Sequence, residues 1–298
     1  MREVASLGQL TNPVLIAGFV THRRAGRIGS RAAAYLVSQW KAELVARTDA
    51  DEFTDFTVDR PESRYVNDER TLQWPDSLLY HATPEGAKRD FLLCVGFEPN
   101  VRWKQFVAEL VDFADAAGIK TLVSLRGFAA NVPHTRPTPV RLTSSDHELG
   151  ESFGIQDQGS RYEGPTDILG VIAAMGQERG WQTVDLSILQ PSYYPRMRNA
   201  AATIAVVTAL DRAFGTSTPV DFLEARATQQ LAEIEAQAPP GKEFGTMVRE
   251  FEEAYDAARG RAEFLTPTDE SSLPPGQDVV DEIERLLRRQ PGNDPGPD

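Results

Sequence analysis

The sequence predicts an α/β fold in which helices cover a largely parallel sheet, followed by a helical C-terminal part. Short apolar runs that end in glycine or polar residues alternate with longer segments whose apolar residues recur at helical spacing. Hydrophobic residues are 41% and charged residues 25% of the 298, which is typical of a globular protein. A chain of this length buries a sizeable core without disulfides or metals.

The first half is expected to hold the central strands and two crossover helices. Residues 13–19 and 90–96 are compact apolar runs that indicate buried strands, and Gly118 stands where a helix C-cap is expected. The full expectation for this half is a strand at 13–19, a helix at 26–46, an edge hairpin from 53–58 and 64–74, a strand at 90–96, a helix from Trp103 to Gly118 and a strand at 120–126.

The second half begins with an irregular region, 127–162, whose length is typical of a functional loop. A subdomain boundary is expected near Thr218, which divides the chain into an α/β domain 1–218, a helical subdomain 219–265 and a tail 266–298. The expected elements are a strand at 140–143, a short helix within 146–154, a helix at 167–179, a strand at 184–189, a buried helix at 199–210, amphipathic helices at 221–237 and 243–264, a linker at 266–277, a short helix at 278–290 and a disordered tail.

Charge is concentrated in the last third of the chain. The net charge is −13, and residues 219–298 hold 18 acidic against 8 basic residues, which is −10 of that total. Such an acidic region repels nucleic acid and anionic lipid, so binding to either is disfavoured. No apolar stretch approaches the ~18 residues of a membrane span, and the N-terminal residues lack the order of a signal peptide. The expected location is the cytoplasm.

The familiar motifs of nucleotide, nucleophile and zinc chemistry are missing from the sequence. Residues 18–29 place glycines between a strand and a helix without a P-loop or a dinucleotide fingerprint. They indicate either a flexible turn or an anion site formed by Arg23, Arg24 and Arg27 at a helix N-terminus. Cys94 lies in an apolar run and is expected to be a core side chain. We therefore expect no cofactor and no metal.

Four groups of polar residues lie just beyond the carboxyl ends of predicted strands, where proteins with an open α/β sheet have their ligand-binding sites. Acid, base and anion contacts would follow if their side chains converge; the alternative is that they form turns and anchor loops. The candidate residues for a ligand or partner site are Glu98, Asn100 and Trp103 in the first group, Arg126, His134 and Arg136 in the second, Tyr162 and Glu163 in the third, and Tyr193 in the fourth.

In this order, the motifs GFEPNVRWKQF (96–106), PHTRP (133–137), YEGPTDILG (162–170) and PSYYP (191–195) resemble those of the PAC2 family, the proteasome assembly chaperone 2-like proteins. The resemblance covers residues 12–215 and extends more weakly to about 265. It implies a three-layer α/β sandwich with a mostly parallel or mixed sheet, similar to nucleoside phosphorylases and related hydrolases. It also implies a homo-oligomer, with trimers expected, and a chaperone or adaptor role.

Two functions follow as hypotheses. The first is a PAC2-like, non-enzymatic assembly chaperone or interaction protein whose client is a proteasome-related or other protein. The second is a protein or enzyme that binds a nucleoside-like or anionic small molecule in a phosphorylase-like pocket, with Glu98, His134, Arg136 and Glu163 around it.

Overall fold

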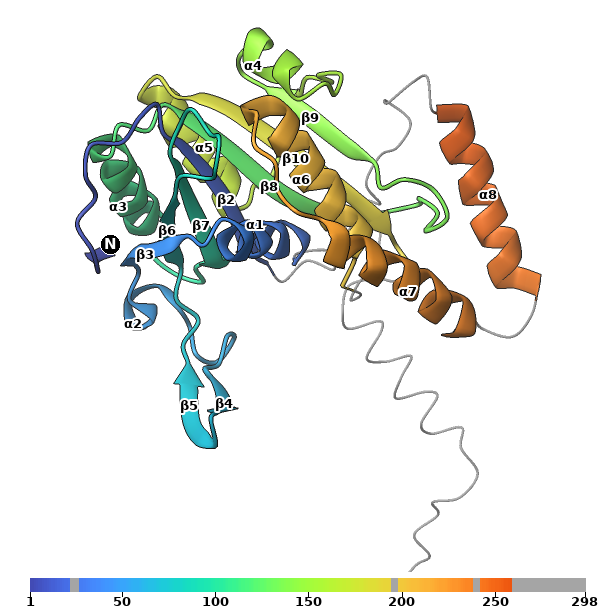
Figure 1. The fold of residues 1–298 in the computed structure, drawn as a ribbon, viewed down its shortest axis with the longest axis horizontal. Helices are drawn as coiled ribbons and strands as arrows, with labels where there is room; N and C mark the ends of the chain where they lie inside the picture. The colour runs from blue at the N-terminus through green and yellow to red at the C-terminus, as the bar shows by residue number, and fades with distance from the viewer. Residues whose placement is uncertain (22–26, 194–197, 238–241, 259–298) are drawn as a thin grey trace, which may run out of the picture.

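The computed structural model describes residues 1–21, 27–193, 198–237 and 242–258 (Figure 1). The sequence-based expectations for the linker at 266–277, the helix at 278–290 and the tail lie outside these residues, as do residues 259–264 of the helix expected at 243–264.

The central sheet has eight strands in the order β1-β3-β6-β7-β2-β8-β10-β9. The inner four, β7, β2, β8 and β10, are parallel to one another, whereas the strands on either side of them pair antiparallel. The sheet is therefore mixed around a parallel centre. Its strands are β1 (Arg2–Glu3), β2 (Val14–Val20), β3 (Glu43–Arg47), β6 (Leu78–Ala82), β7 (Phe91–Phe97), β8 (Thr121–Ala130), β9 (Val140–Ser144) and β10 (Gln182–Pro191).

Helices cover both faces of the sheet and make a three-layer sandwich (Figure 1). A hydrophobic core lies on each face of the sheet, because successive side chains along a strand point to opposite faces. In β2, Ile16 faces the layer of α1 and α6, and Leu15 faces the layer of α3 and α5. The expected fold class is confirmed. The helices of the α/β body are α1 (Ile28–Gln39), α2 (Ala50–Phe53), α3 (Trp103–Ala116), α4 (His147–Ser152), α5 (Ile168–Glu178) and α6 (Ala200–Phe214).

Helix α1 begins directly against the sheet, and two glycines make this approach possible. A Cβ on Gly29 would lie 1.9 Å from the carbonyl oxygen of Leu125 in β8, and one on Gly18 would lie 2.5 Å from the carbonyl oxygen of Gly29. Any larger residue would push the helix away from β2 and β8. Gly18 and Gly29 therefore serve the close packing of α1 on the sheet.

A two-stranded ribbon, β4 (Glu62–Val66) and β5 (Glu69–Gln73), projects from the body (Figure 1). It belongs to residues 49–76, which leave the sheet after β3 and re-enter it at β6. Thr48 and Ser77 join the two ends of this excursion: Thr48 N donates to Ser77 O at 2.9 Å, and Ser77 N donates to the Thr48 hydroxyl at 2.9 Å.

Two expectations for the first half were wrong. The helix expected at 26–46 ends at Gln39, and Lys41, with φ 50°, turns the chain into β3. Leu44 continues the helical spacing, but it pairs with Tyr80 in β6. The strand expected at 53–58 is replaced by α2 and a turn, and the hairpin pairs 62–66 with 69–73 instead. Tertiary pairing decides between helix and strand in such short segments.

Two helices, α7 (Asp221–Gln237) and α8 (Lys242–Ala258), form the C-terminal arm. Helix α7 contacts α6, and its buried apolar residues are Leu223 and Ile234. Helix α8 lies farther from the sheet (Figure 1). In the part of the chain that is described, no helix combines the length and the apolar character needed to span a membrane. The division into domains at Thr218 stays a prediction.

Candidate functional site

Four charged residues meet at the N-terminal end of α5, and we call them the α5 cap cluster: Glu98, Arg126, Asp167 and Asp185. Arg126 in β8 lies between two carboxylates, with Nε 3.0 Å from Asp167 Oδ2 and Nη1 2.5 Å from Asp185 Oδ2. The register of β8 and β10, which pairs Arg126 with Ser187, brings Asp185 to the same place. Burial raises the pKa of Asp185, although the nearby Arg126 favours its charged form.

The same cluster takes up the first N–H groups of α5. Glu98, just beyond β7, accepts a hydrogen bond from Ile168 N at 3.0 Å, and Asp167 accepts one from Gly170 N at 2.9 Å. These are the groups that a helix N-terminus would otherwise offer to an anionic ligand. The cluster is therefore built to hold α5 over the sheet.

Asn100 and Trp103 hold the turn that carries Glu98. The Asn100 side chain accepts from Asp55 N at 2.8 Å and donates to Asp59 Oδ2 at 3.0 Å, so it joins this turn to the loop after α2. Trp103 Nε1 donates to Pro99 O at 2.5 Å. Asn100 therefore has structural partners in the loop after α2, and Trp103 has one in the turn itself.

Tyr162 and Glu163 lie on an exposed loop away from these contacts. The Tyr162 hydroxyl donates to Pro165 O at 2.9 Å, and its side chain is 70% exposed. Glu163 is also exposed. Neither residue makes a contact in the α5 cap cluster, and the expected grouping of Glu163 with Glu98 around one ligand stays a prediction.

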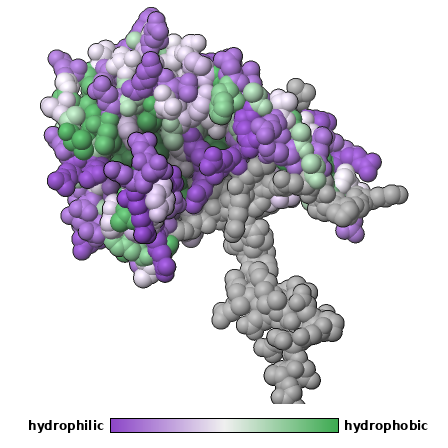
Figure 2. Space-filling view, turned by 60° about the horizontal axis from the view of Figure 1, so that its bottom comes forward, coloured by the Kyte–Doolittle hydropathy of each residue, from purple (hydrophilic) through white to green (hydrophobic). Residues whose placement is uncertain are grey.

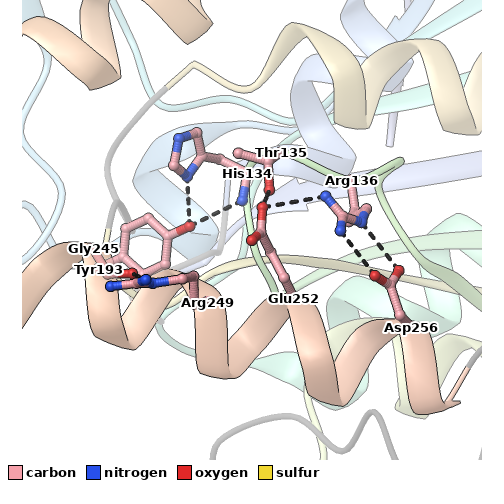
Figure 3. A network of polar contacts seen from close by, with 8 residues as sticks. All are labelled: His134, Thr135, Arg136, Tyr193, Gly245, Arg249, Glu252 and Asp256. Atoms are coloured by element: carbon pink, nitrogen blue, oxygen red, sulfur yellow. Dashed lines mark hydrogen bonds and ion pairs between the residues drawn. The ribbon is translucent and has the colours of Figure 1, made fainter.

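A second polar group joins the loop after β8 to α8, and we call it the clasp: His134, Thr135, Arg136, Tyr193, Glu252 and Asp256 (Figure 3). Arg136 makes a two-point ion pair with Asp256, with Nε 3.0 Å from Oδ1 and Nη2 2.8 Å from Oδ2. Glu252 accepts from the Thr135 hydroxyl at 2.5 Å and from Arg136 Nη1 at 3.2 Å. Hydrogen bonding to Asp256 raises the pKa of Arg136.

His134 and Tyr193 form the apolar end of the clasp. His134 N donates to the Tyr193 hydroxyl at 2.9 Å, and His134 Nδ1 lies 2.7 Å from the same oxygen. Because that oxygen accepts the backbone N–H, its own proton can go to Nδ1, which requires a neutral imidazole. Burial lowers the pKa of His134, against the opposing charges of Glu235 and Glu252. The rings of Phe244 and Phe251 on α8 pack against this pair.

A cavity of about 210 Å³ adjoins the clasp. The loop residues His134, Thr135 and Arg136 form one wall, and Gln230 and Ile234 of α7 form another. Gln230 uses its side-chain oxygen to accept from Ala200 N at 2.9 Å and so caps α6. The cavity does not include Glu98, Arg126 or Glu163. The sequence-based candidates thus fall into separate places.

The predicted anion site is only partly described. Arg23 and Arg24 lie outside the described residues, and Arg27 is exposed at the start of α1. Burial lowers the pKa of Arg31, and the neighbouring charges of Arg198 and Arg27 lower it further. The anion site stays a prediction.

Cys94 is buried in β7, as expected for a core side chain, and burial raises its pKa to about 12. A thiol of that pKa is not a nucleophile at neutral pH. Among the described residues, no three His, Cys, Asp or Glu side chains gather as ligands of a metal ion would.

Sequence reasoning missed Asp185, Glu252 and Asp256. The spacing of Glu252 and Asp256 at i and i+4 places both carboxylates on one side of a helix, which is a usable signal. Their partner Arg136 is distant in sequence, and only the packing of α8 on the loop identifies it. Asp185 depends on the register of two parallel strands, which the sequence does not specify.

The PAC2 family pattern matches residues 15–238, from the start of β2 to the end of α7. The chain belongs to the PAC2 family. Helix α8, and with it one side of the clasp, lies beyond the residues that match.

Several solved structures are similar to this chain. A PAC2 family protein from Streptomyces avermitilis is 31% identical with a TM-score of 0.70, over 80% of this chain and 99% of its own. A proteasome-assembly chaperone homologue from Mycobacterium tuberculosis is 33% identical with a TM-score of 0.69, over 79% and 99%. A second M. tuberculosis protein, of unknown function, is 25% identical with a TM-score of 0.77, over 88% and 90%. No curated protein matches the sequence.

Proposed function

We propose that this PAC2 family protein is a non-enzymatic assembly chaperone that acts in the cytoplasm as a homo-oligomer, a trimer by resemblance, on a proteasome-related client. The similarity to a proteasome-assembly chaperone homologue at 33% identity supports the client class. The observation that supports a non-enzymatic role is the set of contacts in the α5 cap cluster. At the sheet edge where α/β enzymes place catalytic groups, Glu98, Asp167 and Arg126 already make structural contacts.

The exposed surface also fits a protein that binds other proteins. On the face shown in Figure 2, hydrophobic residues form patches between hydrophilic side chains. Large apolar side chains with high exposure include Tyr65 at 76%, Phe222 at 74% and Leu72 at 55%. Clustered exposed apolar residues mark interaction surfaces in soluble proteins.

Assembly of purified proteasome α and β subunits tests this function directly. We expect the full-length protein to bind unassembled subunits and to increase the rate at which rings form, as measured by native mass spectrometry over time. A form that ends at Leu265 should bind them more weakly, because it lacks part of the acidic region. Failure of the full-length protein to bind either subunit type, with an unchanged assembly rate, would overturn the client class.

The cavity beside the clasp favours a second candidate function, the binding of a small nucleoside-like or anionic molecule. His134, Asn199 and Gln230 supply polar groups to an otherwise largely apolar lining, as in many ligand sites. A thermal-shift series with nucleosides, phosphate and ribose phosphates tests it, since a ligand that binds the native state raises the unfolding temperature. A shift that Arg136→Ala abolishes and Glu98→Ala preserves would support binding in this cavity. No shift at millimolar concentrations would reject it.

A further inference from the structure

Helix α8 rests on a loop surface of the α/β body. We call this surface the seat, and it consists of His134, Arg136, Pro137 and Tyr193. The ring of Phe244 is centred 6.4 Å from that of His134 and 5.4 Å from that of Tyr193. The ring of Phe251, two turns later, is centred 6.0 Å from that of Tyr193. The aromatic residues of α8 therefore pack on the two rings of the seat.

Polar contacts continue the same attachment toward the end of α8. Arg136 and the two carboxylates of Glu252 and Asp256 point toward one another (Figure 3), and Asp256 accepts from the guanidinium at two points. The Tyr255 hydroxyl donates to Pro137 O at 3.0 Å. The seat thus holds α8 by rings over its first half and by an arginine and a backbone carbonyl over its second half.

This attachment is half-exposed, in contrast with the packing of the sandwich. The side chains of Arg136 and Asp256 are 33% and 48% exposed, and exposed ion pairs contribute little to stability because water and salt screen them. Phe244, Phe251 and Tyr255 are only half-buried. A 17-residue helix is marginal in water by itself. A competing helix that offers the same groups can therefore replace α8.

The seat recognises a particular kind of helix, and α8 shows which. The side of α8 toward the body carries an apolar or aromatic residue every three or four positions: Phe244, Val248, Phe251 and Tyr255. Counted from Phe244, the carboxylates that meet Arg136 stand at the ninth and thirteenth positions. A two-point pair with a guanidinium selects a planar carboxylate. Side chains on successive turns are how an amphipathic helix is read by a surface.

The seat and its occupant differ in their relation to the family. All four residues of the seat lie within residues 15–238, which match the PAC2 family pattern, whereas α8 begins after them. The surface therefore belongs to the part of the chain that the family pattern describes, and α8 is added to it. A surface of this kind can serve a partner as well as α8.

We propose that the seat is a docking site for an acidic amphipathic helix of a partner protein, and that α8 occupies it in cis as a displaceable strap. The partner helix presents two aromatic rings to His134 and Tyr193 and carboxylates to Arg136. Its arrival detaches α8 and frees the acidic side of that helix. The inference goes beyond the proposed function, because it specifies the chemistry of the bound helix and does not depend on a proteasome-related client.

A fluorescent peptide with the sequence of residues 242–258 tests whether the seat binds a helix in trans. Phe244→Ala with Phe251→Ala in the full-length chain removes two rings from the seat and keeps residues that favour a helix. Fluorescence anisotropy should show that this ring variant binds the peptide at least about ten-fold more tightly than the wild type, where the tethered α8 competes at high effective concentration. Ala254→Ser with Ala257→Ser, on the exposed side of α8, is the matched control and should bind as weakly as the wild type.

Charge reversal identifies the surface that binds the peptide. Glu252→Arg with Asp256→Arg in the full-length chain repels α8 from Arg136 but keeps its rings, and this second opened variant should also bind the peptide more tightly than the wild type. Arg136→Glu added to the ring variant should abolish peptide binding. A peptide that itself carries Glu252→Arg and Asp256→Arg should restore it. Circular dichroism of every variant should match the wild type.

A spin label on α8 tests displacement itself. Cys94 is buried and the pKa of its thiol is raised to about 12, so a thiol reagent labels a Glu253→Cys chain at the exposed position on α8. Excess unlabelled peptide should increase the mobility of the nitroxide, because α8 then leaves the seat.

The opposite results overturn the proposal. Equal peptide affinity of the wild type and the ring variant would show that α8 does not cover the binding site. Two folded, opened variants that do not bind the peptide would reject the seat as a docking site, and full binding after Arg136→Glu would place the peptide elsewhere. Unchanged nitroxide mobility at saturation would show that α8 is not displaced. Because the probe is a peptide, these failures are distinct from failure to bind proteasome subunits.

Discussion

The indole of Trp40 donates a hydrogen bond to the hydroxyl of Thr218 at 2.9 Å and so joins the end of α1 to the segment that leads into α7. Asp211 of α6 accepts from the same hydroxyl at 2.8 Å and from Thr218 N at 2.8 Å. A single buried threonine thus ties the C-terminal arm to two helices of the α/β body.

Thr218→Val should therefore loosen the attachment of α7. It removes a hydroxyl that serves both Trp40 and Asp211, and we expect a loss of about 1–3 kcal/mol in the free energy of unfolding. Urea titration measures that loss, and hydrogen exchange should rise first in residues 219–237. Thr228→Val, an exposed threonine on α7, is the control and should change stability little. Equal effects of the two changes would contradict this role of Thr218.

Gly29→Ala and Gly245→Ala should act in opposite directions. A Cβ at Gly29 collides with the backbone of Leu125, and overpacking of this kind costs about 1–3 kcal/mol or more. A Cβ at Gly245 in α8 meets nothing within 4 Å, and alanine favours a helix by up to about 1 kcal/mol over glycine. A melting temperature that falls for Gly245→Ala as well as for Gly29→Ala would contradict the open space beside Gly245.

The contribution of Asp90 to the free energy of unfolding should depend on pH. Burial alone raises the pKa of Asp90, but hydrogen bonds from Thr11 N, the Thr83 hydroxyl and His81 outweigh it and lower the pKa. The stabilisation from Asp90 is therefore present above its unfolded pKa of about 4 and is lost as the pH falls through the lower folded value.

Asp90→Asn should remove this contribution at pH 7, about 1.5–3 kcal/mol for hydrogen bonds to a charged group. The difference from wild type should shrink as the pH falls toward 3, and urea titrations at pH 7, 5 and 3 measure it. Asp68→Asn, in the exposed hairpin turn, is the control. A constant difference at all three pH values would show that the charge of Asp90 is unimportant.

Arg126→Leu should be strongly destabilising because it leaves Asp185 largely buried without its cation. Breaking such a pair costs about 3–5 kcal/mol. Since burial raises the pKa of Asp185, the variant should regain stability as the pH falls and Asp185 takes up a proton. The double variant Arg126→Leu with Asp185→Leu should recover much of the loss. Thermal unfolding of all three chains checks this, and a double variant no better than the single one would argue against the pairing.

Much of the fold was predictable because its central strands and covering helices carry unambiguous patterns. Residues 91–96 are apolar throughout, as a strand buried on both faces requires, and 199–210 are rich in alanine where α6 packs on the sheet. The candidate site was less predictable. Asp167 could be expected as a helix cap, but its ion pair with Arg126, like those of Arg136 with Glu252 and Asp256, joins residues distant in sequence. Local pattern carries no information on such contacts.

The hydrogen bonds between Thr48 and Ser77 let the exposed ribbon, β4 and β5, vary in sequence without disturbing the sheet. Because the two ends of the excursion are held together by the sheet edge itself, insertions, deletions or substitutions in the ribbon leave the register of β3 and β6 intact. Relatives can therefore carry different ribbons on the same sandwich, and a ribbon exchanged between two relatives should leave the α/β body folded.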